Sequence, residues 1–228
     1  MIEELGESKL GTKAYWDEIY SNELNQYAEC GDEGEVWFGK RTANLMVQYV
    51  AKHIPDKTIR IIDLGCGNGH LCQSLAAKGY NNVLGVDYSA DAINLCLNIA
   101  KDDETGFSPP DYKTVDILDM KSLSGELFQV VLDKGTFDAV SLMPYKDDGQ
   151  ITPADEYVLN LDRIMGPEAI FVLTSCNWTQ TELVSRFQDS KNWKDRHFCL
   201  VDVIPHASFS FGNATGQQVT TLVFKTTK

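Results

Sequence analysis

The stretch Ile59–His70, IRIIDLGCGNGH, most constrains what this chain can fold into. Its apolar residues are Ile59, Ile61, Ile62 and Leu64. Such a run is typical of a strand that is buried on both faces of a parallel sheet, and a helical apolar pattern follows the glycines. Glycine lets the backbone turn sharply and lets a ligand approach, and a helix start offers unpaired N–H groups. The stretch predicts the first half of a nucleotide-binding βαβ unit, with an ordinary tight turn as the alternative.

The spacing of the glycines separates two kinds of nucleotide loop. A dinucleotide fingerprint, G-x-G-x-x-G, would place its third glycine at His70, but here it comes one residue earlier, at Gly69. Asp63 lies two residues before Gly65, the first glycine. The resulting D-x-G-x-G-x-G run resembles the first motif of the seven-β-strand S-adenosylmethionine (SAM) methyltransferases.

Composition limits the class of protein further. The 228 residues suit one domain with short extensions, and 43% hydrophobic and 23% charged residues are ordinary for a globular protein. No apolar run approaches the ~20 residues of a membrane span. The net charge of −13 argues against a nucleic-acid binder, which needs Lys and Arg against phosphate. It suits a basic protein partner, although the acidity could equally serve solubility alone.

Cysteine and histidine usage gives no sign of a metal site. The six cysteines form no C-x-x-C pair and lie mostly among apolar residues, which is typical of buried free thiols. None of the four histidines has H-x-x-x-H spacing, so we expect no metal. The acidic N-terminus lacks an apolar signal core, and we therefore expect a cytoplasmic or nuclear location.

The first part of the chain lies outside the βαβ pattern. Gly11–Cys30 carries its aromatic residues on one helical face, with Thr12 as the expected N-cap, and Arg41–His53 predicts a second helix. Between them, GDEGEVWFG holds two adjacent aromatic residues that must either dock on the core or cover a site. We predict that residues 1–56 form a helical extension covering the cofactor and substrate site, and that residues 57–228 form the core.

Further strands and helices continue the pattern after the glycine loop. The expected strands are Val83–Asp87, Tyr112–Ile117, Phe128–Asp133, Ala169–Thr174, Trp193–Ile204 and Gln218–Thr226. The expected helices are one ending near Gly79 and then Ala90–Lys101 with Ser89 as N-cap, Pro153–Met165 and Thr179–Phe187. This order predicts an α/β fold, a Rossmann-like seven-stranded sheet, mostly parallel with an antiparallel C-terminal hairpin, and helices on both faces. A dehydrogenase would usually add a substrate domain, for which the chain has little room.

Acidic residues stand at the ends of three expected strands, where ligands bind in a doubly wound sheet. Asp87, 22 residues after Gly65, is placed to accept the ribose hydroxyls of an adenosine, which SAM and NAD share. A helix cap or a surface acid is the alternative. Asp116 lies at the end of the third expected strand and could also be a surface acid. Asp133 ends the fourth strand at the edge that faces substrate, and Lys134 could merely pair with it.

Several motifs together resemble one family. They are DLGCGNG, GVDYS, DKGTFDA, TSCNWT and the N-terminal GTKAYWDEIY…GEVWFG. The combination resembles the methyltransferase-like family that methylates a lysine of eukaryotic translation elongation factor 1-alpha, from Gly11 to Phe224. The resemblance implies a SAM-dependent protein-lysine N-methyltransferase, with S-adenosylhomocysteine as product and elongation factor 1-alpha as protein partner. No nucleic-acid or membrane partner is implied, and we expect a monomer.

The resemblance also implies parts for individual residues. Asp133 would be catalytic, orienting the target amine. Asp87 would hold the ribose and Asp116 the adenine, while Trp37 would close the site. The implied cofactor-binding residues are Trp37, Asp63, Gly65, Cys66, Gly67, Asn68, Gly69, Asp87, Tyr88, Asp116, Ile117 and Asp133. The implied substrate-binding residues are Phe38, Asn177, Trp178 and Phe211.

Other functions remain open at this point. A methyltransferase of the same fold could act on another protein or on a small molecule, because the chain has few insertions. The complete motif set disfavours a non-catalytic SAM-binding scaffold. An NAD-dependent oxidoreductase is disfavoured by His70 and by the number of expected strands.

Overall fold

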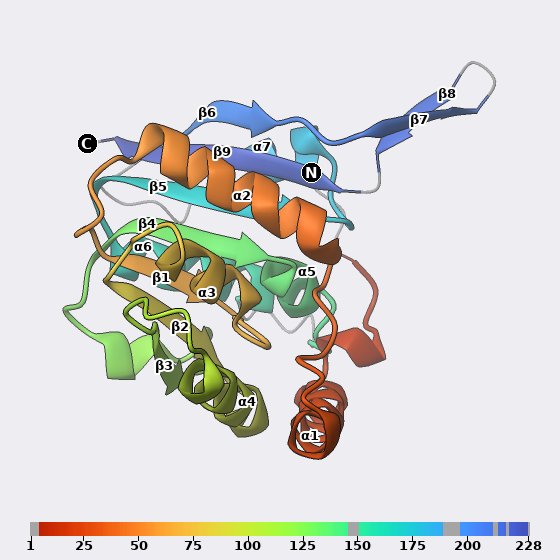
Figure 1. The fold of residues 1–228 in the computed structure, drawn as a ribbon. Coiled ribbons are helices and arrows are strands. Elements are labelled where there is room, and N and C mark those ends of the chain that lie inside the picture. The colour runs from red at the N-terminus through yellow and green to blue at the C-terminus, as the bar shows by residue number, and fades with distance from the viewer. Residues whose placement is uncertain (1–4, 146–150, 189–196, 212–213, 218, 228) are drawn as a thin grey trace.

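A mixed sheet forms the centre of the molecule, with helices on both faces (Figure 1). The computed structural model describes residues 5–145, 151–188, 197–211, 214–217 and 219–227. Within them, seven strands pair in the order β3-β2-β1-β4-β5-β9-β6. Neighbours among β1 to β5 are parallel, whereas β9 is antiparallel to both β5 and β6. The strands are β1 (Ile61–Leu64), β2 (Val83–Asp87), β3 (Asp111–Thr114), β4 (Phe128–Lys134), β5 (Met165–Ser175), β6 (His197–Ile204) and β9 (Thr220–Thr227).

The helices divide between the two faces of this sheet. They are α1 (Lys13–Cys30), α2 (Gly39–His53), α3 (His70–Ala76), α4 (Ala90–Asp102), α5 (Thr136–Ser141), α6 (Pro153–Ile164) and α7 (Gln180–Gln188), with short 3₁₀ turns η1 (Lys9–Gly11) and η2 (Met120–Leu123). Helices α2, α3 and α4 contribute to one apolar cluster, and α5, α6 and α7 to the other. The predicted fold class, with its antiparallel C-terminal strand pair, is confirmed.

Strand β1 shows why both faces must be covered. All four of its residues are buried, and Ile62 and Leu64 pack with α5–α7 while Ile61 packs with α2–α4. Successive side chains of a strand point to opposite faces, so an uninterrupted apolar run requires a layer on each side. Burying one such side chain stabilises the fold by about 1.5–3 kcal/mol relative to leaving it in water.

The ends of the elements follow local side-chain chemistry. The Ser89 hydroxyl accepts a bond from the Ala92 N–H, which confirms the predicted N-cap of α4. Thr12 lies at the N-cap position of α1, but its hydroxyl donates to the Lys9 carbonyl at 2.7 Å instead of capping the helix. The predicted N-cap position of Thr12 is confirmed, but its side chain bonds to the preceding η1 turn and does not cap the helix.

Several strand boundaries differ from those expected; β5, for example, begins at Met165 rather than at Ala169. Strand β3 ends at Thr114, before Asp116, whose carboxylate accepts the Leu118 N–H at 2.9 Å and forms a local turn. This side-chain bond competes with the ladder and ends the strand early. Between β6 and β9 a separate hairpin of β7 (Ser208–Phe211) and β8 (Ala214–Gln217) projects from the sheet (Figure 1). The expected start of the sixth strand, Trp193, lies outside the described residues.

The N-terminal part of the chain packs along one edge of the core. The Tyr27 hydroxyl of α1 donates to Asp102 of α4 at 2.9 Å, and the Ser8 N–H donates to the Leu142 carbonyl after α5 at 3.1 Å. A Cβ atom on Gly11 would meet the Leu142 oxygen at 2.1 Å, so the backbone there lies directly on the core. These contacts bring α1 to the edge of the sheet where β1, β2 and β4 end.

Gly69 and Gly79 both have a left-handed backbone conformation, but only Gly69 is closely packed, so substituting each one measures how much the packing contributes to stability. A Cβ on Gly69 (φ 75°) would lie 2.8 Å from the Tyr112 hydroxyl and 2.9 Å from the Cys96 sulfur, whereas one on Gly79 (φ 87°) meets nothing within 4 Å. We expect Gly79→Ala to lower the free energy of unfolding by about 1–2 kcal/mol. Gly69→Ala should cost about 1–3 kcal/mol more through overpacking. If urea unfolding showed the same loss of unfolding free energy in both variants, the residues around Gly69 would be able to move aside for a Cβ atom without cost.

Candidate active site

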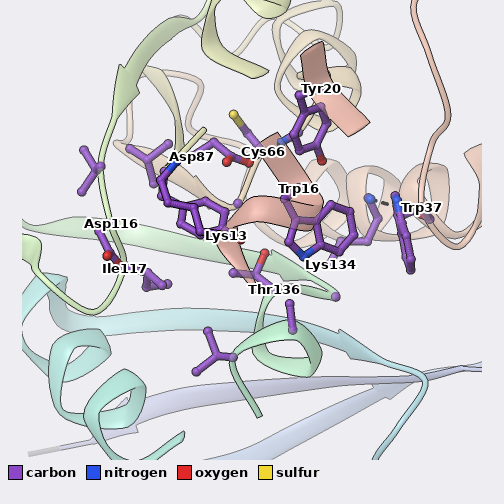
Figure 2. Close-up of a pocket in the computed structure, with 18 of the residues that line it drawn as sticks. Lys13, Trp16, Tyr20, Trp37, Cys66, Asp87, Asp116, Ile117, Lys134 and Thr136 are labelled. Carbon is purple, nitrogen blue, oxygen red and sulfur yellow. Dashed lines mark hydrogen bonds between the residues drawn. The ribbon is translucent and has the colours of Figure 1, made fainter. Parts of the chain in front are cut away.

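A cavity lies where β1, β2 and β4 end (Figure 2). The chain order reverses on the two sides of β1, and ligands of doubly wound sheets bind at such a switch point. The cavity is walled by α1, by the α1–α2 connection, by the glycine loop and by the turns that follow β3 and β4. The sequence-predicted residues in its wall are Trp37, Gly65, Cys66, Gly67, Asn68, Asp87, Tyr88, Asp116 and Ile117.

The glycine loop has no room for side chains. Gly65 and Gly67 have φ values of 66° and 54°, a region that favours glycine. A Cβ on Gly65 would lie 2.1 Å from the Thr136 hydroxyl oxygen, and one on Gly67 would lie 2.6 Å from the Tyr20 hydroxyl oxygen. Thr136 is itself fixed, because its hydroxyl donates to the Leu64 carbonyl at 2.6 Å. The backbone of the loop therefore forms the floor of the cavity directly.

Asp87 links this loop to the start of α4. One carboxylate oxygen accepts the Gly67 N–H at 3.1 Å, and the other accepts the Ser89 N–H at 2.9 Å. Burial raises the pKa of Asp87 to about 6, and these N–H bonds oppose the rise. An ionised carboxylate has about four acceptor sites, so the group can still accept hydroxyl donors from a ligand in the cavity.

The far end of the cavity is formed by the turn after β3 and by the first turn of α1. Asp116 and Ile117 line this end (Figure 2), and Tyr88 also belongs to the cavity wall. The Lys13 ammonium lies 5.1 Å from the centre of the Tyr88 ring and pairs with Asp17 at 2.7 Å. This end thus combines an apolar side chain with polar atoms, as a flat heteroaromatic ring requires.

Aromatic residues of the N-terminal extension form the opposite wall. Trp16 stacks on Tyr20 with ring centres 6.1 Å apart, and it meets Trp37 edge-on at 4.9 Å (Figure 2). The Trp16 indole N–H donates to the Leu10 carbonyl at 2.7 Å. Trp16 and Tyr20 were not among the predicted site residues, because aromatic spacing on one helical face is the same for core packing and for a cavity wall.

The segment Asp32–Phe38, here called the strap, connects α1 to α2 and passes over the glycine loop. The Asn68 side-chain amide donates to the Glu33 carbonyl at 3.0 Å and to the Glu35 carbonyl at 3.3 Å. The Lys134 ammonium donates to the Trp37 carbonyl at 3.1 Å (Figure 2). Two side chains of the core therefore hold the strap over the cavity, and Lys134 is a wall residue that sequence reasoning had treated only as an ion-pair partner.

Asp63 and Gly69 lie behind the cavity wall. The Cys72 thiol donates to the Asp63 carboxylate at 3.5 Å, and burial raises the pKa of Asp63 to about 7 while nearby Lys134 opposes the rise. Gly69 is the N-cap residue of α3 and packs against β3. The cofactor-binding part that the resemblance implies for Asp63 stays a prediction.

The structure does not bring Asp133 into the cavity wall. Its carboxylate is fully buried and accepts the Thr136 and Phe137 N–H groups, both at 2.9 Å, and the Tyr157 hydroxyl at 2.5 Å. Burial raises its pKa to about 7. Alternation along β4 turns this side chain toward α5 and α6, so it holds the start of α5. Its predicted part in orienting an amine stays a prediction that this position does not support.

The predicted substrate-contacting residues are spread over several environments. Phe38 (φ 60°) lies at the start of α2 with its ring 3.1 Å from where a Cβ of Gly135 would be. The structure corrects the prediction for Trp178. Its side chain is 3% exposed and packs in the core, with its ring centre 6.0 Å from that of Phe137. Asn177 is exposed outside the cavity wall. Phe211 belongs to β7, and its side chain lies outside what the structure describes.

Among the described residues, no group of three or more His, Cys, Asp or Glu side chains is arranged to hold a metal ion. In the same residues, none of the helices has the length and apolar character needed to cross a membrane.

Comparison with known proteins agrees with this geometry. Residues 55–225 match the methyltransferase domain family. A solved structure of magnesium protoporphyrin IX methyltransferase from Synechocystis PCC 6803, with bound S-adenosylhomocysteine, superposes with a TM-score of 0.64. It covers 94% of this chain and 99% of that one at 14% identity, a likeness of fold alone. The fold and the cavity thus define a methyltransferase.

Curated relatives narrow the class. EEF1A lysine methyltransferase 2 of Homo sapiens is 38% identical over 219 residues, covering 96% of this chain and 87% of the relative. Protein-lysine N-methyltransferase efm4 of Schizosaccharomyces pombe is 37% identical, covering 97% and 95%. The chain belongs to the family of protein-lysine methyltransferases that contains these two proteins, which confirms the resemblance found in the sequence.

Asp133 and Tyr157 allow a test of the buried carboxylate. We expect Asp133→Asn and Tyr157→Phe both to lower the free energy of unfolding, by about 1–3 kcal/mol each, because buried hydrogen bonds to a charged group are lost. Methyl transfer should fall in both variants in step with SAM affinity. Denaturant unfolding, calorimetry and turnover would be measured together.

If the Asp133 carboxylate acted directly on the substrate, the two variants would differ in methyl transfer. Asp133→Asn would then abolish transfer at full SAM affinity, while Tyr157→Phe would keep near-normal turnover. That result would place the Asp133 carboxylate at the reacting atoms and contradict the positioning part that its contacts indicate.

Proposed function

We propose that this methyltransferase transfers the methyl group of SAM to the ε-amine of a lysine in translation elongation factor 1-alpha. The observation that carries the proposal is the match to relatives named for this reaction over 96–97% of the chain. That span includes the N-terminal extension, whose aromatic residues wall the cavity. The part of the chain nearest to an incoming substrate therefore lies within the match.

The cavity suits an adenosyl cofactor on its own evidence. The backbone of Gly65 and Gly67 lines the cavity without a side chain, so a ligand can lie directly against it. Asp87 would accept the ribose hydroxyls, and Asp116 and Ile117 would hold the adenine ring. When bound, SAM supplies an electrophilic methyl group on a positively charged sulfur and leaves as S-adenosylhomocysteine.

The residues of the chain have three tasks in such a transfer. The amine must lose its proton to attack, although a free lysine titrates near ~10.4, and desolvation by an apolar wall lowers that value. Trp16, Tyr20 and Trp37 provide this wall and present ring faces that attract cationic groups. The wall also excludes water and holds the amine in line, and positioning of this kind can supply much of the rate.

The surroundings of the cavity fit a basic protein as partner. The chain has a net charge of −13, and the exposed Glu35 stands in the cavity wall. Opposite charge speeds encounter with a basic partner. We further propose that the protein acts as a monomer, and a substrate of the translation machinery supports a cytoplasmic location.

The decisive experiment is methyl transfer from radiolabelled SAM to purified elongation factor 1-alpha. We expect label on a lysine with the parent enzyme and about a hundredfold lower transfer with Asp87→Ala, because the adenosyl moiety loses its buried acceptor. Asp103→Ala is the matched control, since that exposed carboxylate bonds within its own turn to Thr105. SAM binding with no label on elongation factor 1-alpha would move the reaction to another protein or a small molecule.

The raised pKa of Asp87 gives a pH dependence with a definite sign. Because this pKa is about 6 in the cofactor-free protein, an acceptor carboxylate is lost as the pH falls through 6. We expect SAM affinity to be about tenfold weaker at pH 5 than at pH 7.5 by calorimetry, as expected from one linked proton. In Asp87→Asn, SAM affinity should no longer fall between pH 7.5 and pH 5. If the pH dependence of SAM affinity were the same as in the parent, Asp87 would not hold the ribose.

Loss of fold does not explain such a decrease. A carboxyl whose pKa is raised on folding favours the folded state at low pH, and this contribution is lost as the pH rises from about 3.9 through the folded value. Protonation of Asp87 near pH 5 therefore stabilises the cofactor-free fold while it weakens cofactor binding.

A further inference from the structure

The strap is held mainly by side chains of the core. It lies between Gly31 and Gly39, both with φ 76°. Two local bonds involve its backbone, from the Gly39 N–H to the Val36 carbonyl at 2.7 Å and from the Gly34 N–H to the Asp32 carboxylate at 3.2 Å. Three of its carbonyl oxygens accept bonds from Asn68 and Lys134. Both donors come from elements that also build the floor of the cavity.

We propose that Asn68 and Lys134 are positioning residues that hold the strap, and through it the Trp37 indole, against the glycine loop, and so set the placement of the target amine. The inference rests on the proposed function for its substrate. It concerns how this chain couples its cofactor floor to its substrate wall.

Asn68 is suited to this task because its amide is fully used. It is 7% exposed, its two N–H bonds go to Glu33 and Glu35, and its oxygen accepts the His70 N–H at 3.3 Å. One side chain thus joins the strap to the start of α3. A buried amide that lost the strap would keep unsatisfied donors, so the bound arrangement is favoured.

Lys134 provides the second attachment at the end of β4. Its ammonium donates to the Trp37 carbonyl at 3.1 Å, and the carboxyl groups of Asp63 and Asp133 lie near enough to offset part of its desolvation. A bond from a charged donor is stronger than one between neutral groups. Lys134 therefore fixes the strap at the residue whose ring lines the cavity.

The rings of the strap transmit this attachment to the substrate wall. Trp37 meets Trp16 at 4.9 Å, and Phe38 packs against Gly135 from a left-handed backbone conformation that a side chain rarely adopts. Such a conformation persists where the surroundings hold it. On α1, the Glu23 carboxylate accepts the Glu35 N–H at 3.0 Å, so the strap is attached on both sides of the cavity.

Hydrogen exchange tests the attachment without any substrate. Asn68→Asp keeps the acceptor for His70 but replaces the two donors by an oxygen, and Lys134→Met keeps chain length but loses its donor. The controls are Asn81→Asp and Lys78→Met, at exposed positions outside the cavity. We expect amide exchange over residues 31–39 to rise about tenfold or more in the first two variants only. Unchanged exchange, or a rise spread evenly over the chain, would overturn the proposal.

A double-variant cycle tests the consequence for transfer. Lys134→Met should lower kcat/KM for the protein substrate by about tenfold or more, and by more than it raises the SAM dissociation constant. In a Trp37→Ala background, the same substitution should cost less than about twofold, because the ring it positions is gone. The proposal would be contradicted if Lys134→Met lowered kcat/KM by the same factor with and without Trp37→Ala, or if SAM affinity fell by as much as kcat/KM.

The two measurements separate this inference from the proposed function. If the parent enzyme leaves elongation factor 1-alpha unlabelled, the proposed substrate is wrong, yet the exchange experiment still decides whether Asn68 and Lys134 hold the strap. If the substrate is labelled and exchange over residues 31–39 is unchanged, the proposed function stands and the positioning role fails.

Discussion

The close approach of the Gly65–Asn68 loop to its neighbours is the constraint on which the rest of the site depends. Two of its glycines have positive φ and lack space for a Cβ, because Thr136 and Tyr20 already occupy that space. Asp87 fixes the loop from the neighbouring strand by accepting the Gly67 N–H. The loop therefore sets the position of the turn after β4 on one side and the position of α1 on the other. A looser loop would admit side chains, but it would lose the backbone floor.

Charge placement beneath this floor follows from the same geometry. Asp63, Asp87 and Asp133 are all buried at the carboxyl ends of adjacent strands, and burial raises the pKa of each. Nearby Lys134 and the N–H groups of the following turns compensate these charges. Burying charges in this way costs stability, and such costs concentrate at functional sites. The carboxylate that faces the cavity, Asp87, is the one suited to bind a ligand.

The sequence predicted the parts of the site that depend on local pattern. The glycine loop, Asp87 and Trp37 all line the cavity, because motif spacing and strand ends specify them directly. Trp16 and Tyr20 escaped prediction, since an aromatic helical face gives no sign of whether it meets a core or a cavity. Asp133 shows a different limit. A strand end marks the edge of the sheet, but the parity of the residue decides which face its side chain takes. Asp133 lies two residues after the buried Val131, so its side chain points to the same face of the sheet, toward α5 and α6.

The strap links the floor of the cavity to its aromatic wall. The floor and the adenosine end of the cavity are made by elements of the common sheet, whereas Trp16, Tyr20 and Trp37 come from the N-terminal extension. An extension that merely covered the core could shift without affecting transfer. Here the Asn68 and Lys134 bonds reach from the core to the backbone of the strap, so the aromatic wall takes its position from the cofactor floor. Because in-line transfer is sensitive to displacements of about 1 Å, such coupling would make the placement of the target amine depend on the floor of the cavity.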